Sequence, residues 1–115
     1  MSTESQPFPP REPSVYRPTV HFHERLKDKY DEYNRHIDGE IIEGCIRNGD
    51  AERVGPDIYH FRATFGGVTY RLVVNTDRSV VITGHPISIN TEVARDSGRW
   101  STDQIEDIRE FIAAK

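Results

Sequence analysis

The chain has 115 residues, of which 35% are hydrophobic and 30% charged, and a formal net charge of −4 at pH 7. This length predicts one domain. No apolar run approaches the roughly 20 residues of a membrane-spanning helix, and the acidic balance argues against broad electrostatic wrapping of nucleic acid. The single cysteine, Cys45, excludes an internal disulfide and a multi-cysteine metal site. Without a secretory leader pattern at its start, we expect a cytoplasmic protein.

The first 18 residues differ in composition from the rest of the chain. They hold five of the seven prolines, among Ser, Thr, Glu and Gln residues. Each proline removes a backbone hydrogen-bond donor and biases the preceding residue toward extended geometry. We therefore predict a flexible proline-rich arm over residues 1–18 and a single α+β domain over residues 19–115.

The domain is expected to open with a short strand and a helix. Residues Thr19–His23 alternate polar and apolar side chains, which is the period of a strand. Leu26, Tyr30 and Tyr33 then recur at the spacing of one helical face. This pattern predicts the first of two helices that precede the main sheet.

A second helix is expected to follow Asp38 and to end at Asn48-Gly49. Asp38 is a good N-cap, and Ile37 and Ile42 occupy the two positions of a hydrophobic staple. The predicted apolar stripe consists of Ile41, Ile42, Cys45 and Ile46. On this stripe Cys45 is expected to be a small buried hydrophobic residue and not a nucleophile.

A β-hairpin is predicted over residues 58–75. Apolar and polar side chains alternate on both sides of Gly66-Gly67, a pair suited to the positive φ angles of a two-residue turn. The pairs that such a turn predicts are Phe65–Val68, Ala63–Tyr70 and Phe61–Leu72. All these side chains lie on one face, and a slip by one residue would destroy the agreement.

A second turn, at residues 76–79, leads to a third strand over Val80–His85 that can pair with the second. With Asn75 opposite the first residue of this strand, the register places His85 on the apolar face. Pro86 cannot donate to a sheet and is expected to end the strand.

Residues 87–99 are expected to be irregular, and a C-terminal helix follows them. Ser101 and Gln104 form a capping-box pattern, with Trp100 and Ile105 as the staple. The order of elements predicts an α+β fold with an antiparallel three- to four-stranded meander sheet, two helices before it and one C-terminal helix.

The hairpin face opposite the core carries residues suited to chemistry. In the predicted register Arg62 lies directly across from Arg71, with His60 on the strand of Arg62. Like charges in this position disfavour the sheet by about 0.2–1 kcal/mol, so an anionic ligand or protein carboxylates must offset them. Two guanidinium groups beside an imidazole can bind a phosphodiester and transfer a proton. Internal pairing with acidic residues of the C-terminal helix or the loops is the alternative.

Histidines also suggest a metal site, although less specifically. His21 and His23 form an H-x-H pattern on the predicted first strand, and His60 or His85 could complete a three-histidine site. No spacing enforces that meeting, and the common nucleotide, hydrolase and zinc-protease motifs are absent from the sequence. We therefore expect neither a metal nor a cofactor.

Residues 20–85 resemble a small prokaryotic domain family of unannotated function that is similar in topology to the RelE/ParE-type toxins. The matching residues are His23, Arg25, Arg35, Ile37 and Asn48-Gly49, followed by a meander of three strands. The resemblance implies a toxin-like RNA-binding domain that could act as a metal-independent endoribonuclease. In that role His60 or His23 would perform acid–base chemistry, and Arg62, Arg71 and Arg25 would bind phosphate.

The alternative is a non-catalytic interaction or regulatory module in which the Arg62/Arg71 pair is neutralised internally. Ile58, Val73 and Ile82 lie on the same face as the arginines in the predicted register. A bare sheet rarely exposes a group of aliphatic side chains to water, so a protein partner or a homodimer could cover them. The C-terminal helix is expected to dock across this face, where its acidic side chains could approach the arginines; docking on the core face, which would leave the arginines open to an anion, is the alternative.

Overall fold

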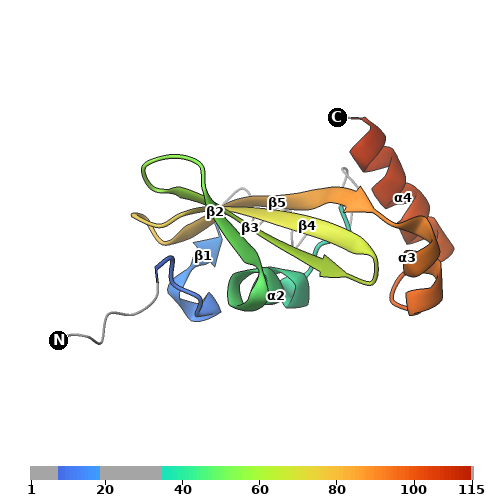
Figure 1. Ribbon diagram of the computed structural model, residues 1–115, viewed down its shortest axis with the longest axis horizontal. Coiled ribbons are helices and arrows are strands. Elements are labelled where there is room, and N and C mark those ends of the chain that lie inside the picture. The colour runs from blue at the N-terminus through green and yellow to red at the C-terminus, as the bar shows by residue number, and fades with distance from the viewer. Residues whose placement is uncertain (1–7, 19–34, 115) are drawn as a thin grey trace.

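The computed structural model describes residues 8–18 and 35–114, and a five-stranded mixed sheet forms its centre (Figure 1). The strands are β1 (Arg17–Pro18), β2 (Asp50–Arg53), β3 (Ile58–Phe65), β4 (Val68–Asn75) and β5 (Val80–Ile89), in the spatial order β1-β5-β4-β3-β2. β1 runs parallel to β5, and the other pairs are antiparallel. The helices are the 3-10 turn η1 (Pro13–Val15) and α2 (Gly39–Asn48), α3 (Thr91–Ser97) and α4 (Thr102–Ala113). The predicted α+β class is confirmed.

The β3–β4 hairpin has the register that its alternation predicts. Phe65 pairs with Val68, and Arg62 pairs with Arg71. Gly66 and Gly67 have φ angles of 52° and 79°, the left-handed conformations that a two-residue turn of this kind needs at both positions.

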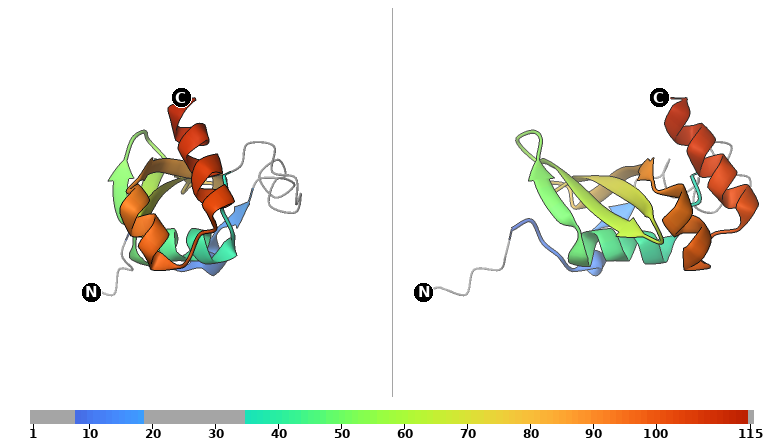
Figure 2. Two further views of the ribbon diagram at one scale, coloured as in Figure 1. Left: turned by 90° about the vertical axis from the view of Figure 1, so that its right-hand side faces the viewer. Right: turned by 45° about the vertical axis from the view of Figure 1, so that its right-hand side comes forward.

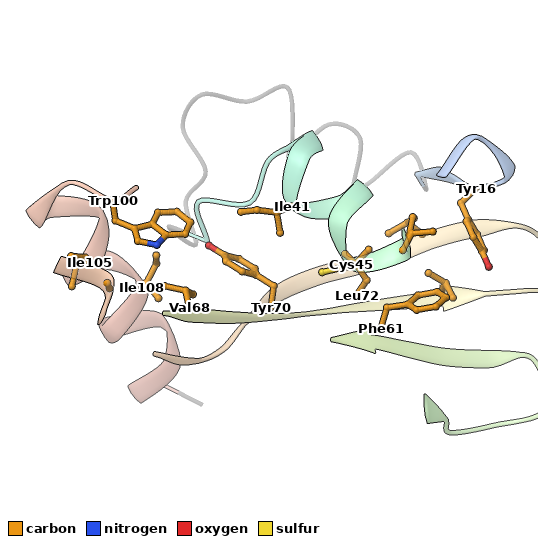
Figure 3. Close-up of a cluster of buried hydrophobic side chains, with 14 residues drawn as sticks. Tyr16, Ile41, Cys45, Phe61, Val68, Tyr70, Leu72, Trp100, Ile105 and Ile108 are labelled. Carbon is orange, nitrogen blue, oxygen red and sulfur yellow. The ribbon is translucent and has the colours of Figure 1, made fainter. Parts of the chain in front are cut away.

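Helix α2 packs on the apolar face of this hairpin (Figures 1 and 3). Asp38 Oδ1 accepts a hydrogen bond from the Ile41 amide at 2.9 Å, which confirms the predicted N-cap. Cys45 is fully buried in the core, as expected. The other core residues with no exposed surface are Ile41, Phe61, Val68, Tyr70, Leu72, Val74, Ala94 and Ile108.

The expected antiparallel sheet of three or four strands is wrong in detail. β2 pairs with β3 through the residues Asp50–Arg53, which are all exposed. Because this edge strand buries no side chain, no apolar alternation marks it in the sequence. The predicted strand Thr19–His23 and the helix carrying Leu26 lie outside the described residues, so α2 is the one α-helix before the antiparallel strands β2–β5 in the described part of the chain.

The third strand is longer than predicted, and its register shifts twice. β5 continues through Pro86 to Ile89, with irregularities opposite Val73/Val74 and Thr69/Tyr70. At the first shift Val74 pairs with Val81 but Val73 pairs with Thr83, so one extra residue is inserted. A bulge of this kind reverses which face the following side chains occupy. The prediction that His85 lies on the apolar face is therefore wrong.

The C-terminal region holds two helices where we expected an irregular segment and one helix. The short helix α3 begins after Asn90, whose Oδ1 accepts from the Val93 amide, and ends at Gly98 with φ 73°. It buries Ala94 alone, so it carries no apolar stripe from which to predict it. α3 and α4 lie together at one end of the sheet (Figures 1 and 2).

Helix α4 packs its buried residues at the end of the core and does not lie across Ile82 as we expected, although its Phe111 ring lies 6.1 Å from the ring of His85. Its predicted capping box at Ser101 and Gln104 is present, but Ile105 and Ile108 join the core. Trp100 stacks on Tyr70 with ring centroids 6.2 Å apart, which holds the start of α4 at the hairpin end of the core (Figure 3). Ile82 on the other face keeps 38% of its surface exposed.

Part of the segment predicted as a flexible arm packs on the domain in the structure. Tyr16 is 7% exposed and meets Phe61 edge to face, and its hydroxyl donates to the Pro10 carbonyl at 2.8 Å. The guanidinium of Arg11 lies 5.1 Å from the centre of the Phe61 ring. β1 then joins the sheet through Arg17. Residues 8–18 therefore contribute to the core.

Candidate functional site

The polar face is the side of the sheet opposite α2, and two rows of paired residues cross it. The first row is Asp50, Arg62, Arg71 and His85, on β2, β3, β4 and β5. The second row is Glu52, His60, Val73 and Thr83 on the same strands. The structure thus brings together the predicted site residues Arg62, Arg71 and His60, and adds two carboxylates and a second imidazole.

Arg62 has a carboxylate partner within the protein. Its Nη2 lies 3.9 Å from Oε1 of Glu52, and both side chains are about half exposed. Asp50 is its direct cross-strand neighbour on β2. At such exposure an ion pair contributes little, on the order of 0–1 kcal/mol, so the Arg62 guanidinium remains able to bind another anion.

Arg71 differs from Arg62 in its surroundings. Its Nη2 hydrogen-bonds Nε2 of His85 at 3.1 Å, and no carboxylate oxygen of the described residues lies within 4.0 Å of its guanidinium. Its Nε is buried without a hydrogen-bond partner. Because a guanidinium has donors and no acceptors, this contact requires His85 to present an unprotonated Nε2. Arg71 therefore carries a positive charge that no carboxylate of the described chain balances.

His60 lies in the second row, between Glu52 on β2 and Val73 on β4. Burial is the main cause that lowers its pKa below the ordinary 6.5, and the positive charges of Arg71 and Arg62 lower it further, while Glu52 acts in the opposite direction. His60 is therefore a neutral imidazole near pH 7, which is the form that can accept a proton.

A shallow depression of about 500 Å³ adjoins the arginines at the hairpin end of this face. Its lining residues are Asn48, Asp50, Arg62, Ala63, Thr64, Thr69 and Ile87. Oγ1 of Thr64 and Oγ1 of Thr69 are hydrogen-bonded to each other at 2.8 Å across the β3–β4 pair. The depression thus combines hydroxyl, amide, carboxylate and guanidinium groups.

Three of the predicted residues cannot be placed. His21, His23 and Arg25 lie outside the described residues. Within residues 8–18 and 35–114, no group of three His, Cys, Asp or Glu side chains is arranged to hold a metal ion. The described helices likewise include none long and apolar enough to cross a membrane.

Two residues of the polar face, Asp50 and Glu52, were missed from the sequence, and a third, His85, was misplaced. Asp50 and Glu52 belong to the fully exposed strand β2, and their alternation with Ala51 was the one available signal. His85 was recognised but assigned to the wrong face, because the bulge in β5 leaves no mark in the sequence pattern.

Comparison with known proteins adds no relative. No protein-family model matches the chain, and neither a curated protein nor a solved structure matches it. The geometry of the polar face is therefore the basis for the functional argument.

Proposed function

We propose that this protein binds RNA through the polar face of its sheet. The observation that carries the proposal is the pairing of Arg62 with Arg71, in which Arg71 has no carboxylate partner among the described residues. Two adjacent guanidinium groups bind the oxygens of one phosphodiester through charge-assisted hydrogen bonds. A bound phosphate would also offset the repulsion between the two cations.

The composition of the face supports a local and not a broad contact with nucleic acid. The net charge of −4 disfavours wrapping, and Asp50 and Glu52 flank the arginines on the sheet edge. A ligand that places one or two phosphates near Arg71 fits this distribution better than a long duplex, whose backbone would also meet the carboxylates.

In the more specific form of this proposal, the protein also cleaves the bound RNA and needs no metal ion to do so. Neutral His60 can accept the proton of a ribose 2′-hydroxyl as that oxygen attacks the adjacent phosphorus, while the arginines stabilise the charge on the phosphoryl oxygens. The bond from phosphorus to the 5′-oxygen then breaks, which leaves a 2′,3′-cyclic phosphate, and the departing 5′-oxygen takes up a second proton. His23 is the candidate for the second proton transfer, and Arg25 for a further phosphate contact. The proposal also includes the expectation from the sequence that the protein is toxin-like, with a RelE-like domain, and acts in the cytoplasm.

Binding of a fluorescein-labelled single-stranded RNA, measured by anisotropy at several salt concentrations, tests the proposal. Arg71→Gln should weaken binding by about tenfold or more and reduce the salt dependence by about one counterion. Arg62→Gln should have a smaller effect, because Glu52 already shares its charge. Arg95→Gln on exposed α3 is the matched control. Absence of salt-dependent binding by the unmodified protein would refute the proposal.

Cleavage is tested separately, on denaturing gels with a chelator present. His60→Gln should abolish cleavage of an RNA that the protein still binds. Intact RNA after prolonged incubation with the unmodified protein would refute the proposed cleavage but not the proposed RNA binding.

A non-catalytic interaction module is the second candidate, and the Arg62–Glu52 contact at 3.9 Å favours it. The two rows together hold two carboxylates, Asp50 and Glu52, and two guanidinium groups, Arg62 and Arg71, so their formal charges balance when both histidines are neutral. Ile82, 38% exposed on the same side, adds apolar area for a protein partner or a second copy. Light scattering over a range of concentrations distinguishes the candidates, because a dimer through this face would cover Arg71.

A further inference from the structure

We infer that the depression next to the arginine pair is a ribose subsite, which makes the polar face selective for RNA over DNA. This inference rests on the proposed RNA binding and names the part of the ligand that the depression recognises. A ribose differs from a deoxyribose by its 2′-hydroxyl, which both donates and accepts hydrogen bonds and allows a protein to distinguish the two.

The hydroxyl groups of Thr64 and Thr69 are the first feature of the depression that suits a ribose. They are hydrogen-bonded to each other at 2.8 Å, so one hydroxyl donates to the other. The accepting hydroxyl keeps its own proton, and both oxygens keep lone pairs. Thr64 is exposed on the polar face, and both residues line the depression beside Arg62. This pair can therefore both donate to and accept from a sugar hydroxyl.

The Asp50 carboxylate is the second feature of the depression that suits a ribose. A carboxylate beside a phosphate is unfavourable, yet Asp50 lies opposite Arg62 and lines the same depression. A carboxylate is, however, a strong acceptor for a hydroxyl proton. In the inferred binding mode, a ribose hydroxyl donates a hydrogen bond to the Asp50 carboxylate while the attached phosphate contacts the Arg62 guanidinium. This arrangement explains why an acidic residue lies beside an arginine that binds phosphate.

The depression is large enough to hold a sugar together with its attached phosphate. The depression measures about 500 Å³, and the aliphatic side chain of Ile87 contributes an apolar contact to its polar lining. Asn48, the last residue of α2, adds an amide that both donates and accepts. None of the lining residues is an aromatic side chain on which a base could stack, so the inferred contact is with the sugar and its hydroxyls.

The test compares three oligonucleotides of one sequence, made of RNA, DNA and 2′-O-methyl RNA, in the anisotropy assay. The unmodified protein should bind RNA about threefold to tenfold more tightly than DNA. The 2′-O-methyl RNA should bind with an affinity close to that of DNA, because it lacks the 2′-hydroxyl proton that would be donated in a hydrogen bond to Asp50.

Two variants localise this preference. Thr64→Val removes the hydroxyl while keeping a β-branched side chain suited to a strand, and Asp50→Asn removes the carboxylate charge. Both should bring RNA affinity close to DNA affinity, and Thr102→Val on α4 should leave the preference unchanged.

The outcomes separate this inference from the function on which it rests. Salt-dependent binding that needs Arg71 but is equal for RNA and DNA would overturn the ribose subsite and leave RNA binding intact. An RNA preference that survives Thr64→Val and Asp50→Asn would also overturn it. Failure to bind any of the three oligonucleotides would refute the proposed function itself.

Discussion

Arg71 on β4 is joined to His85 on β5 by a hydrogen bond of 3.1 Å between Nη2 and Nε2. The contact exists because a bulge in β5 places His85 on the polar face instead of in the core. It holds Arg71 beside Arg62 through a neutral partner, so the positive charge of Arg71 is oriented without being neutralised. The same charge acts on His60, which lies one row away on the same face.

The first prediction concerns the titration of His60. Its pKa is lowered first by burial, then by Arg71, against the opposing effect of Glu52. In an NMR titration its ring proton should shift with a midpoint below 6.5. Arg71→Gln should raise that midpoint and Glu52→Gln should lower it further. A midpoint insensitive to both substitutions would mean that burial alone determines the pKa.

The same lowered pKa has a consequence for stability. A group whose folded-state pKa is depressed contributes stability above its unfolded pKa and loses it as the pH falls through the folded value. For His60 the loss therefore begins near the ordinary value of 6.5 and continues as the pH falls. In urea denaturation, His60→Gln should show a shallower decline of the free energy of unfolding over this range.

The second prediction concerns Cys45. Burial raises the pKa of its thiol to about 12, against a smaller lowering by a hydrogen bond with the backbone of Ala63. The nucleophilic thiolate is therefore absent from the folded protein near neutral pH. A thiol reagent should leave the native protein unmodified at about pH 8 and label one thiol after denaturation in guanidinium. Rapid labelling of the native protein would show that α2 separates readily from the sheet.

Alkaline pH should destabilise the protein through the same thiol. Because the folded-state pKa is raised, the contribution is fully present below the ordinary value of 9.0 and is lost as the pH rises toward about 12. Cys45→Ala removes this dependence and serves as the comparison in denaturation experiments above pH 9.0.

The sequence predicted those elements in which local chemistry and burial agree. The β3–β4 hairpin combined alternation with Gly66-Gly67, so one register alone paired the apolar side chains of Phe61, Ala63 and Phe65 with those of Leu72, Tyr70 and Val68. Helices α2 and α4 had recognisable caps at Asp38 and Ser101. The opposition of Arg62 and Arg71 followed directly from the hairpin register, which is why this part of the site could be predicted.

The remaining elements depend on contacts that local patterns do not encode. β2 is exposed throughout and is held by its pairing with β3. In β5, Val81 pairs with Val74 and Thr83 pairs with Val73, so the bulge lies between these two pairs. Its position depends on the pairing of β4 with β5 and not on the local sequence. Because each inserted residue reverses the face of those that follow, the position of His85, and with it the partner of Arg71, could not be derived from the alternation.

The third prediction tests whether residues 8–18 contribute to the core. Tyr16 is 7% exposed and packs against Phe61, so Tyr16→Ala should lower the free energy of unfolding by about 3 kcal/mol. Phe8→Ala is the control, because Phe8 is 67% exposed and should change stability by less than about 0.5 kcal/mol. Equal, small effects of both substitutions in urea denaturation would show that this segment does not stabilise the domain.

The last prediction separates backbone strain from packing at the hairpin turn. Gly67 and Gly98 have nearly equal φ angles, 79° and 73°. A Cβ atom at Gly98 would meet nothing within 4 Å, whereas one at Gly67 would lie 2.8 Å from the Ala94 amide nitrogen and 2.9 Å from the Asn90 carbonyl oxygen. Gly98→Ala should therefore cost only the left-handed conformation of a non-glycine residue, about 1 kcal/mol.

Gly67→Ala should cost that amount and also force the start of α3 away from the turn, because the obstructing atoms belong to the backbone and cannot rotate aside. Its loss of stability in urea denaturation should be about twice that of Gly98→Ala, or more. The Trp100 side chain, whose Nε1 donates to the Gly66 carbonyl at 3.1 Å, provides a fluorescence signal at the same turn. Equal losses for the two variants, with unchanged Trp100 fluorescence, would show that α3 does not pack tightly on the hairpin.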